Sequence, residues 1–359
     1  MSGRLERCRM EIVAAGVDAV LVTDPFDVRY LSGFLGDDAT LLIGPETALI
    51  CTDSRFWEQV HEEVDGFELS KVTTSDLLTH SLKAAEEACG SAARLGYQGS
   101  HLSHAGYRRL RRAFHGALRD VGDRVTRLRA VKDEEEIGVM RRAAAVTDEA
   151  LAAVVSRGLV GRREADVAWD LQTEYHRLGA EGEAFGAIVA AGDHAAQAHA
   201  LPGLRVIRAG DLVVIDTGAR VDGYCSDITR TFAAGEPDDE LRRTYDLVLE
   251  AQLAGLGAVR AGAHGRRDVD AAARAVIEAA GSGGRFGHGT GHGVGLEVHE
   301  APLLGRTRGD ALEAGMVCTV EPGIYVEGLA GVRIEDTVLV TAGGGERLTR
   351  YPKELLVVG

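Results

Sequence analysis

Helix-like and strand-like segments alternate along the first half of the chain. Leu5, Cys8 and Ile12 recur at helical spacing over 2–16, and 19–22 is a short apolar run that ends at the polar sequence TDP. Further strands are expected at 41–43 and 48–51, and further helices at 54–64, 75–89 and 103–114. This alternation is typical of an α/β layer.

A charged stretch at 124–136 separates this layer from the rest of the chain. Within it, Asp133 and Glu136 have the spacing of a capping box, which predicts that a long helix begins there. Helices expected near 134–157, 163–178, 238–260 and 267–280 accompany a glycine-rich region of paired strands. The chain also exceeds the roughly 250–300 residues at which one hydrophobic core stops growing. We therefore expect an α/β (α+β) protein with two domains, 1–131 and 132–359.

Composition narrows the class of protein. With 40 Lys and Arg against 55 Asp and Glu, the formal net charge is −15, which argues against nucleic-acid binding because phosphate recognition needs a basic face. The five cysteines are widely spaced without a C-x-x-C pair, which is typical of reduced thiols. No stretch approaches the roughly 20 apolar residues of a membrane helix, and the N-terminus does not resemble a signal peptide. We therefore expect a cytoplasmic protein without nucleic-acid or membrane partners.

The most informative segment is DLVVIDTGARVDGYCSDITRTF at 211–232. Its Asp222-Gly223 dipeptide predicts a tight hairpin turn. The register that follows pairs Val221 with Tyr224, Gly218 with Asp227 and Asp216 with Thr229. Asp216 and Asp227 then lie diagonally on one face, within reach of a common ion. Burying an unpaired carboxylate costs several kcal/mol, so Asp216, which follows four apolar residues, needs a partner.

A second carboxylate pair lies in VCTVEPGIYVEGLAGVRIEDTVLV at 317–340. Glu321 and Glu335 are placed symmetrically about Gly328, so a hairpin with its tip at that glycine would bring the two carboxylates face to face. Any one of these acids alone would favour a salt bridge or a position facing solvent. Four of them at such spacings favour a shared site.

Histidines and glycines alternate between the two hairpins, in GHGTGHGVGLEVHE at 287–300. A lone core histidine is more often satisfied by a carbonyl, but here the glycines suggest close approach of the backbone to a ligand. His288, His292 and His299 are the candidates, together with His199, 17 residues before Asp216. Carboxylates with imidazole suit two Mn²⁺, Co²⁺ or Zn²⁺ ions, which about 3.5–4 Å apart hold a bridging hydroxide for hydrolysis.

With these motifs in order, the chain resembles the pita-bread metallopeptidases, in the branch of Xaa-Pro aminopeptidases (aminopeptidase P) and prolidases. The resemblance rests on IDTGARVDGYCSDITRTF, HGTGHGVGLEVHE, EPGIYV and GVRIEDTVLV, and more weakly on DVRYLSGF at 27–34. It implies an N-terminal creatinase/prolidase-like α/β domain before a pita-bread catalytic domain. It also implies a homodimer acting on proline-containing peptides.

The resemblance assigns a role to each candidate residue. Five would hold two divalent ions, most plausibly Mn²⁺: Asp216, Asp227, His292, Glu321 and Glu335. Asp227 and Glu335 would bridge both ions. His199 and His299 would hydrogen-bond the scissile carbonyl and stabilise the tetrahedral intermediate, and His288 would lie near the pocket. Arg333 would support the carboxylates. Glu321 would take the proton of the attacking hydroxide and pass it to the proline nitrogen.

One departure from the family pattern bears on substrate length. Prolidases, which cleave dipeptides, commonly place an arginine just after the His-Glu pair to hold the substrate's carboxylate, and this chain has Leu303 at about that place. We therefore expect an aminopeptidase acting on longer peptides, with a prolidase as the alternative if Arg306 or Arg308 reaches the site. A creatinase-like amidinohydrolase, a related lyase and a scaffold protein without turnover are weaker alternatives, because all five ligand positions are filled.

Overall fold

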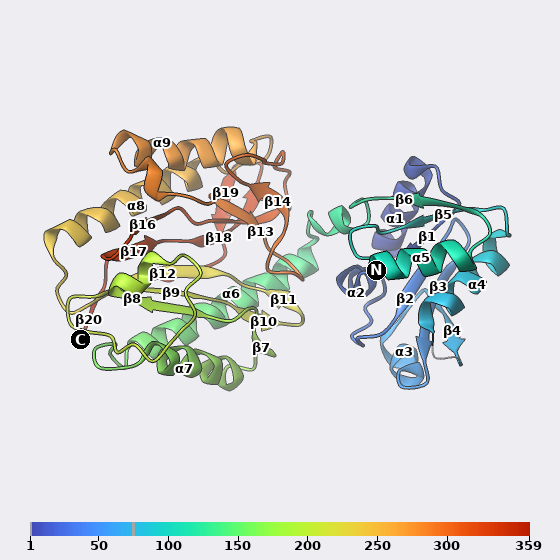
Figure 1. Cartoon of the computed structure of the whole chain (residues 1–359), viewed down its shortest axis with the longest axis horizontal. Helices are drawn as coiled ribbons and strands as arrows, with labels where there is room; N and C mark the ends of the chain where they lie inside the picture. The colour runs from blue at the N-terminus through green and yellow to red at the C-terminus, as the bar shows by residue number, and fades with distance from the viewer. Residues whose placement is uncertain (1, 74–75) are drawn as a thin grey trace. The chain divides into compact units, whose positions relative to one another are not determined.

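The structure is a computed structural model that describes residues 2–73 and 76–359. It divides into two compact units, Met1–Arg129 and Ala130–Gly359, which occupy the blue-to-green and green-to-red parts of Figure 1. Residue 75, where one helix was expected to begin, lies outside the described residues. Among the described residues, no helix combines the length and apolar character needed to cross a membrane.

The first unit is a mixed sheet with helices packed on it, as its alternating pattern predicted. The strands run in the order β4-β3-β2-β1-β5-β6. The central strand β1 is buried at all four positions, because neighbouring strands and helices such as α4 cover it. Its elements are α1 (Ser2–Ala15), β1 (Ala19–Val22), α2 (Pro25–Ser32), β2 (Thr40–Ile43), β3 (Ala48–Asp53), α3 (Trp57–Glu63), β4 (Glu68–Val72), α4 (Leu77–Cys89), β5 (Arg94–Tyr97), α5 (His104–Ala113), β6 (Ala117–Asp120) and the 3-10 turn η1 (Thr126–Arg129).

The first predicted hairpin of the second unit forms with the expected turn. Asp222 and Gly223 have φ values of 46° and 78°, as a type I′ turn requires. The predicted pairs Val221–Tyr224 and Asp216–Thr229 are confirmed. The hairpin is nevertheless split between two sheets at Gly218, where a Cβ would overlap the carbonyl oxygen of Ser226. One sheet has the order β20-β12-β9-β8 and the other β11-β10-β7; their strands are β7 (Gly182–Glu183), β8 (Ile188–Ala191), β9 (Leu212–Thr217), β10 (Ala219–Val221), β11 (Tyr224–Cys225), β12 (Ile228–Ala234) and β20 (Val357–Val358).

The second predicted hairpin has its tip at Gly328, whose φ is 72°. Val326 pairs with Ala330, and Val320 pairs with Asp336, so the register is symmetric about Gly328 as predicted. The hairpin contributes to a sheet in the order β14-β13-β15-β18-β19 and to the ribbon β16-β17. These strands are β13 (Gly291–Gly293), β14 (Glu300–Leu304), β15 (Val317–Val320), β16 (Gly323–Val326), β17 (Ala330–Arg333), β18 (Asp336–Thr341) and β19 (Gly344–Arg347).

Two pairs of helices enclose these sheets, with α6 and α7 on one side and α8 and α9 on the other (Figure 1). The predicted capping box is confirmed: Asp133 accepts from the Glu136 N–H, and the Glu136 side chain accepts from the Asp133 N–H. The helix expected over 267–280 forms as a continuous helical segment, whose first turn is a π-helix that leads directly into α9. The helical elements are α6 (Glu134–Val155), α7 (Glu164–Arg177), η2 (Gly192–Ala196), α8 (Asp239–Ala258), η3 (Gly265–Asp270), α9 (Ala271–Ala279) and η4 (Gly283–Arg285).

Candidate metal centre

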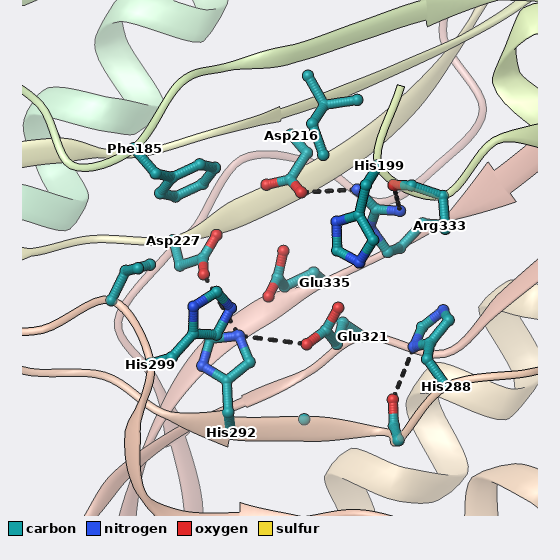
Figure 2. Close-up of a pocket in the computed structure, with 15 residues that line it drawn as sticks. Phe185, His199, Asp216, Asp227, His288, His292, His299, Glu321, Arg333 and Glu335 are labelled. Carbon is teal, nitrogen blue, oxygen red and sulfur yellow. Dashed lines mark hydrogen bonds and ion pairs between the residues drawn. The ribbon is translucent and has the colours of Figure 1, made fainter. Parts of the chain in front are cut away.

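A cavity of about 250 Å³ lies between the sheets of the second unit. Every candidate site residue from the sequence lines it: His199, Asp216, Asp227, His288, His292, His299, Glu321, Arg333 and Glu335. Figure 2 shows the four carboxylates directed into a common space, with the His292 imidazole facing them. The sequence patterns therefore predicted residues that the fold brings together.

The carboxylates lie on strands or at breaks between strands. Asp216 is on β9, whereas Asp227 precedes β12, Glu321 follows β15 and Glu335 precedes β18. The Glu321 N–H donates to Thr290 O at 2.7 Å, and the Glu335 N–H donates to Thr229 O at 3.0 Å. These bonds hold the backbone at the breaks without a regular ladder, so the side chains turn into the cavity.

Asp227, His292 and Glu335 form the tightest part of the site. Each offers one ligand atom, and these atoms all lie within 4.8 Å of one another. His292 Nε2 is 3.6 Å from Asp227 Oδ2 and 3.3 Å from Glu321 Oε1. The Thr229 hydroxyl donates to Glu335 Oε2 at 2.7 Å and fixes that carboxylate. Together with Asp216 these side chains present several oxygens and one imidazole nitrogen to the same volume.

Burial and mutual repulsion control the charges of this cluster. Burial first, and then the neighbouring carboxylates, raise the pKa values of Asp227 and Glu335 well above their ordinary range. Burial opposes charge on His292, but its hydrogen bond and ion pair with Glu321 outweigh burial and raise the His292 pKa to about 9. The same pair lowers the Glu321 pKa to about 2, against the effect of burial. Such like-charge crowding is relieved by a bound cation.

The donor set fits divalent metal ions. Asp216 Oδ1 and Asp227 Oδ1 are buried, and within the described part of the chain neither has a hydrogen-bond partner. A buried carboxylate oxygen without a donor is costly, and a cation supplies the missing partner. Carboxylate oxygens with one imidazole suit Mn²⁺, Co²⁺ or Zn²⁺.

Arg333 connects this cluster to Tyr325 and His288. Its Nη2 donates to Asp216 Oδ2 at 2.6 Å, and its Nε donates to Thr229 Oγ1 at 3.1 Å. Its Nη1 donates to the Tyr325 hydroxyl at 2.7 Å, and that hydroxyl lies 3.0 Å from His288 Nε2. The sequence analysis did not single out Tyr325. The hairpin register could have indicated it. Gly323 pairs with Arg333, and Tyr325, two residues after Gly323, lies on the same face of the strand.

His199 and His299 are exposed side chains at the cavity, while His288 is partly buried. The His299 ring centroid is 4.2 Å from that of His292, and burial and the His292 charge lower the His299 pKa. In the view of Figure 2, His199 and His299 lie on either side of the carboxylates. Phe185, Ile188 and Val298, which the sequence analysis did not name, add apolar wall. The two exposed imidazoles are therefore accessible to a bound peptide.

The glycines around His292 are required by the packing of the strands. A Cβ on Gly291 would overlap the carbonyl oxygen of Thr319, and one on Gly293 would overlap that of Ala301. The expectation that these glycines bring the backbone close to a ligand stays a prediction, and Gly291 does line the cavity. They allow β13 to pack tightly between β15 and β14.

Leu303 and the nearby arginines lie outside the cavity. Leu303 is on β14, paired with His292, and its exposed fraction is 46%. Arg306 and Arg308 are exposed on the following loop. Among the described residues that line the cavity, Arg333 is the one guanidinium, and it is already hydrogen-bonded to Asp216.

Comparison with known proteins agrees with this arrangement. Residues 138–342 match metallopeptidase family M24, and residues 4–131 match the creatinase/prolidase N-terminal domain. The structure is similar to that of an Xaa-Pro dipeptidase from Bacillus anthracis, with TM-score 0.96, 38% identity and coverage of 99% of each chain. It is also similar to an X-Pro aminopeptidase from Thermotoga maritima, with TM-score 0.87, 36% identity and coverage of 97% of this chain and 100% of that one.

A further relative is similar over nearly the whole length of both chains. The Xaa-Pro dipeptidase of Pyrococcus furiosus is 35% identical over 99% of this chain and 100% of its own length. A family match over more than half of the chain and relatives of full length leave no ambiguity about descent. The chain therefore belongs to metallopeptidase family M24, whose members are metal-dependent hydrolases.

Proposed function

We propose that the protein is a dinuclear-metal peptidase that hydrolyses the N-terminal Xaa-Pro bond of peptides longer than two residues. The observation that carries the proposal is the cavity itself, where four carboxylates and His292 face two exposed imidazoles. The residues that would hold the ions are Asp216, Asp227, His292, Glu321 and Glu335. Bound there, two divalent ions would supply Lewis acidity and a nucleophile at neutral pH.

The residues of the chain perform the remaining steps. His199 and His299 donate hydrogen bonds to the scissile carbonyl oxygen and stabilise the negative charge that develops there. Glu321 accepts the proton released during attack and passes it to the departing proline nitrogen. His288 and Arg333 line the part of the cavity where the substrate would lie. An Xaa-Pro bond has no N–H, so apolar contacts with the proline ring must supply the selectivity, and Phe185 is suited to this.

The preference for longer peptides rests on charge. A dipeptide presents its carboxylate next to the scissile bond, and a buried or half-buried carboxylate needs a cationic partner. The guanidinium of Arg333 is engaged with Asp216, and Leu303 supplies no charge. A longer peptide presents a neutral carbonyl at this point, which needs no such partner.

A second candidate function is a prolidase that acts on Xaa-Pro dipeptides. It is favoured by the names of two relatives similar over nearly the whole chain, the Xaa-Pro dipeptidases of Bacillus anthracis and Pyrococcus furiosus. A cation from outside the cavity, such as Arg306 or Arg308, would then hold the substrate's carboxylate.

We further propose Mn²⁺ as the metal, a cytoplasmic location and a homodimer. Mn²⁺ suits an oxygen-rich donor set. All five cysteines are free thiols, which is typical of a reducing compartment. The homodimer rests on the family resemblance alone.

The test is hydrolysis of two substrates by purified protein with added Mn²⁺, followed by mass spectrometry. One substrate is an Xaa-Pro dipeptide, and the other is a longer peptide beginning with Xaa-Pro. We expect cleavage of the longer peptide, abolished in Asp227→Ala and retained in Asp246→Asn, which alters an exposed acid on α8. Cleavage of the dipeptide alone would establish the prolidase. Cleavage of neither, with two metals bound, would refute both.

A further inference from the structure

A buried acid with no role in the proposed hydrolysis lies next to the loop that carries His199. Glu164 is the first residue of α7 and has an exposed fraction of 0%. It does not line the cavity. Its carboxylate instead accepts hydrogen bonds from three groups of the segment 191–203, in the middle of which His199 stands.

The three donors bracket His199 along the chain. The Ala191 N–H donates to Glu164 Oε1 at 2.9 Å, and the Gly203 N–H donates to Oε2 at 3.2 Å. His194 Nδ1 is 2.9 Å from Oε2 and donates to the carboxylate as well. One carboxylate therefore joins the beginning, the first turn and the end of the segment, a contact between residues 27 to 39 positions apart.

The His199 side chain has no comparable anchor of its own. Within the described part of the chain, no hydrogen bond joins the His199 ring to a protein group, and the ring lines the cavity. On the metal side, Arg333 Nη1 donates to the Ala198 carbonyl at 3.0 Å. The apolar side chains that follow, Leu201 and Leu204, are 82% and 77% exposed. The loop packs through the small side chains of Ala195 and Ala200, which join a buried cluster. Neither alanine side chain offers a polar group to the ring, so polar contacts with the loop backbone help to set the place of His199.

We propose that Glu164, with His194 as its side-chain partner, is the positioning residue that sets His199 in the cavity. Glu164 holds both ends of the loop, and Arg333 holds its middle. Loss of the carboxylate lets the loop and the ring move while the proposed metal ligands stay in place. The inference rests on the proposed function for the role of His199, because a displaced ring no longer donates to the scissile carbonyl.

The variants follow from the donor geometry. Glu164→Gln keeps the shape, but its amide nitrogen must face an N–H that needs an acceptor. His194→Ala removes one donor, whereas His194→Asn returns an amide N–H near the position of Nδ1. Asp193→Asn is the matched control, because Asp193 lies on the same loop and pairs at the surface with Arg205.

Hydrogen exchange of the metal-free protein tests whether Glu164 holds the loop, and it needs no turnover. In Glu164→Gln we expect faster exchange at the amides of Ala191 and Gly203 and through the segment between them. His194→Ala should do the same to a smaller degree, and His194→Asn should restore slow exchange. Unchanged exchange in both Glu164→Gln and His194→Ala, or equal acceleration in Asp193→Asn, would overturn the inference.

A double-mutant cycle with His199→Ala tests whether Glu164 affects turnover through His199. A displacement of about 1 Å can reduce turnover roughly 100-fold, so we expect Glu164→Gln to lower kcat by about 10- to 100-fold with two metals still bound. In the His199→Ala background the same change should lower kcat less than about twofold, because residues that act through one group are not additive. Equal losses in both backgrounds would overturn the inference. If the wild-type protein cleaves no Xaa-Pro peptide, the proposed function fails, and exchange still decides whether Glu164 holds the loop.

Discussion

Replacing Leu303 by arginine is expected to move substrate preference towards dipeptides. Leu303 pairs with His292 in the antiparallel register of β14 and β13, and directly opposed residues project to the same face of a sheet. Strand β14 is at the edge of its sheet, and the Leu303 side chain is 46% exposed. A longer guanidinium at this position therefore extends along the face that holds His292, towards the cavity.

The size of the effect follows from the missing cation. A hydrogen bond to a charged group contributes about 1.5–3 kcal/mol, and each 1.36 kcal/mol is a factor of ten in rate. Leu303→Arg should therefore raise kcat/KM for an Xaa-Pro dipeptide by about 10- to 150-fold. Burial of a whole leucine contributes roughly 1.5–3 kcal/mol. Because Leu303 is about half exposed, the loss of folding stability should be near 1 kcal/mol, which leaves the protein folded.

The assay compares kcat/KM for the dipeptide and for a longer peptide with the same first two residues. Leu303→Gln is the control, because it introduces a polar side chain without charge and should leave the ratio of the two values nearly unchanged. If Leu303→Arg leaves this ratio unchanged, or if Leu303→Gln changes it equally, a cation at position 303 does not pair with the substrate's carboxylate.

Three further outcomes are expected. Asp227→Asn should bind fewer than two metals and lose more than about 100-fold in kcat, since even partners of metal ligands contribute 10- to 100-fold; full metal content by elemental analysis would contradict this. Because the raised pKa values of Asp227, Glu335 and His292 (about 9 for the histidine) leave protons on the metal-free site, metal binding should release protons and affinity should rise from pH 6 to pH 8. Calorimetry in buffers of different ionisation enthalpy measures this release, and a pH-independent affinity would refute it. Asp336→Ala should lower the free energy of unfolding by about 3–5 kcal/mol, because buried Arg230 and Lys353 share that carboxylate at 2.8 Å each; urea denaturation checks it, and a loss below 1 kcal/mol would count against the ion cluster.

The registers of both hairpins could be predicted because local chemistry determines them. Asp222-Gly223 accepts the positive φ values of a tight turn, and Gly328 does the same at the second tip. Once a turn is fixed, alternation determines which side chains share a face. Asp216, Glu321 and Glu335 therefore followed from counting along the chain.

Contacts between distant segments could not be predicted in this way. The Thr229–Glu335 hydrogen bond joins residues 106 positions apart, and no local pattern marks Thr229 as its donor. Tyr325 and Glu164 likewise read as an ordinary strand residue and an ordinary acid of a first helical turn. The glycines at 291 and 293 were noticed, but only the neighbouring strands show why a side chain is excluded there.

The composition of the cluster from two remote hairpins bears on when activity arises during synthesis. Asp216 and Asp227 are translated first, and Glu335 follows 108 residues after Asp227. A ribosome adds about 5–20 residues per second, so roughly 5 to 20 seconds pass between the translation of Asp227 and that of Glu335. During that interval the nascent chain has no complete site. A nascent chain therefore cannot hydrolyse peptides with its own site until Glu335 has been translated.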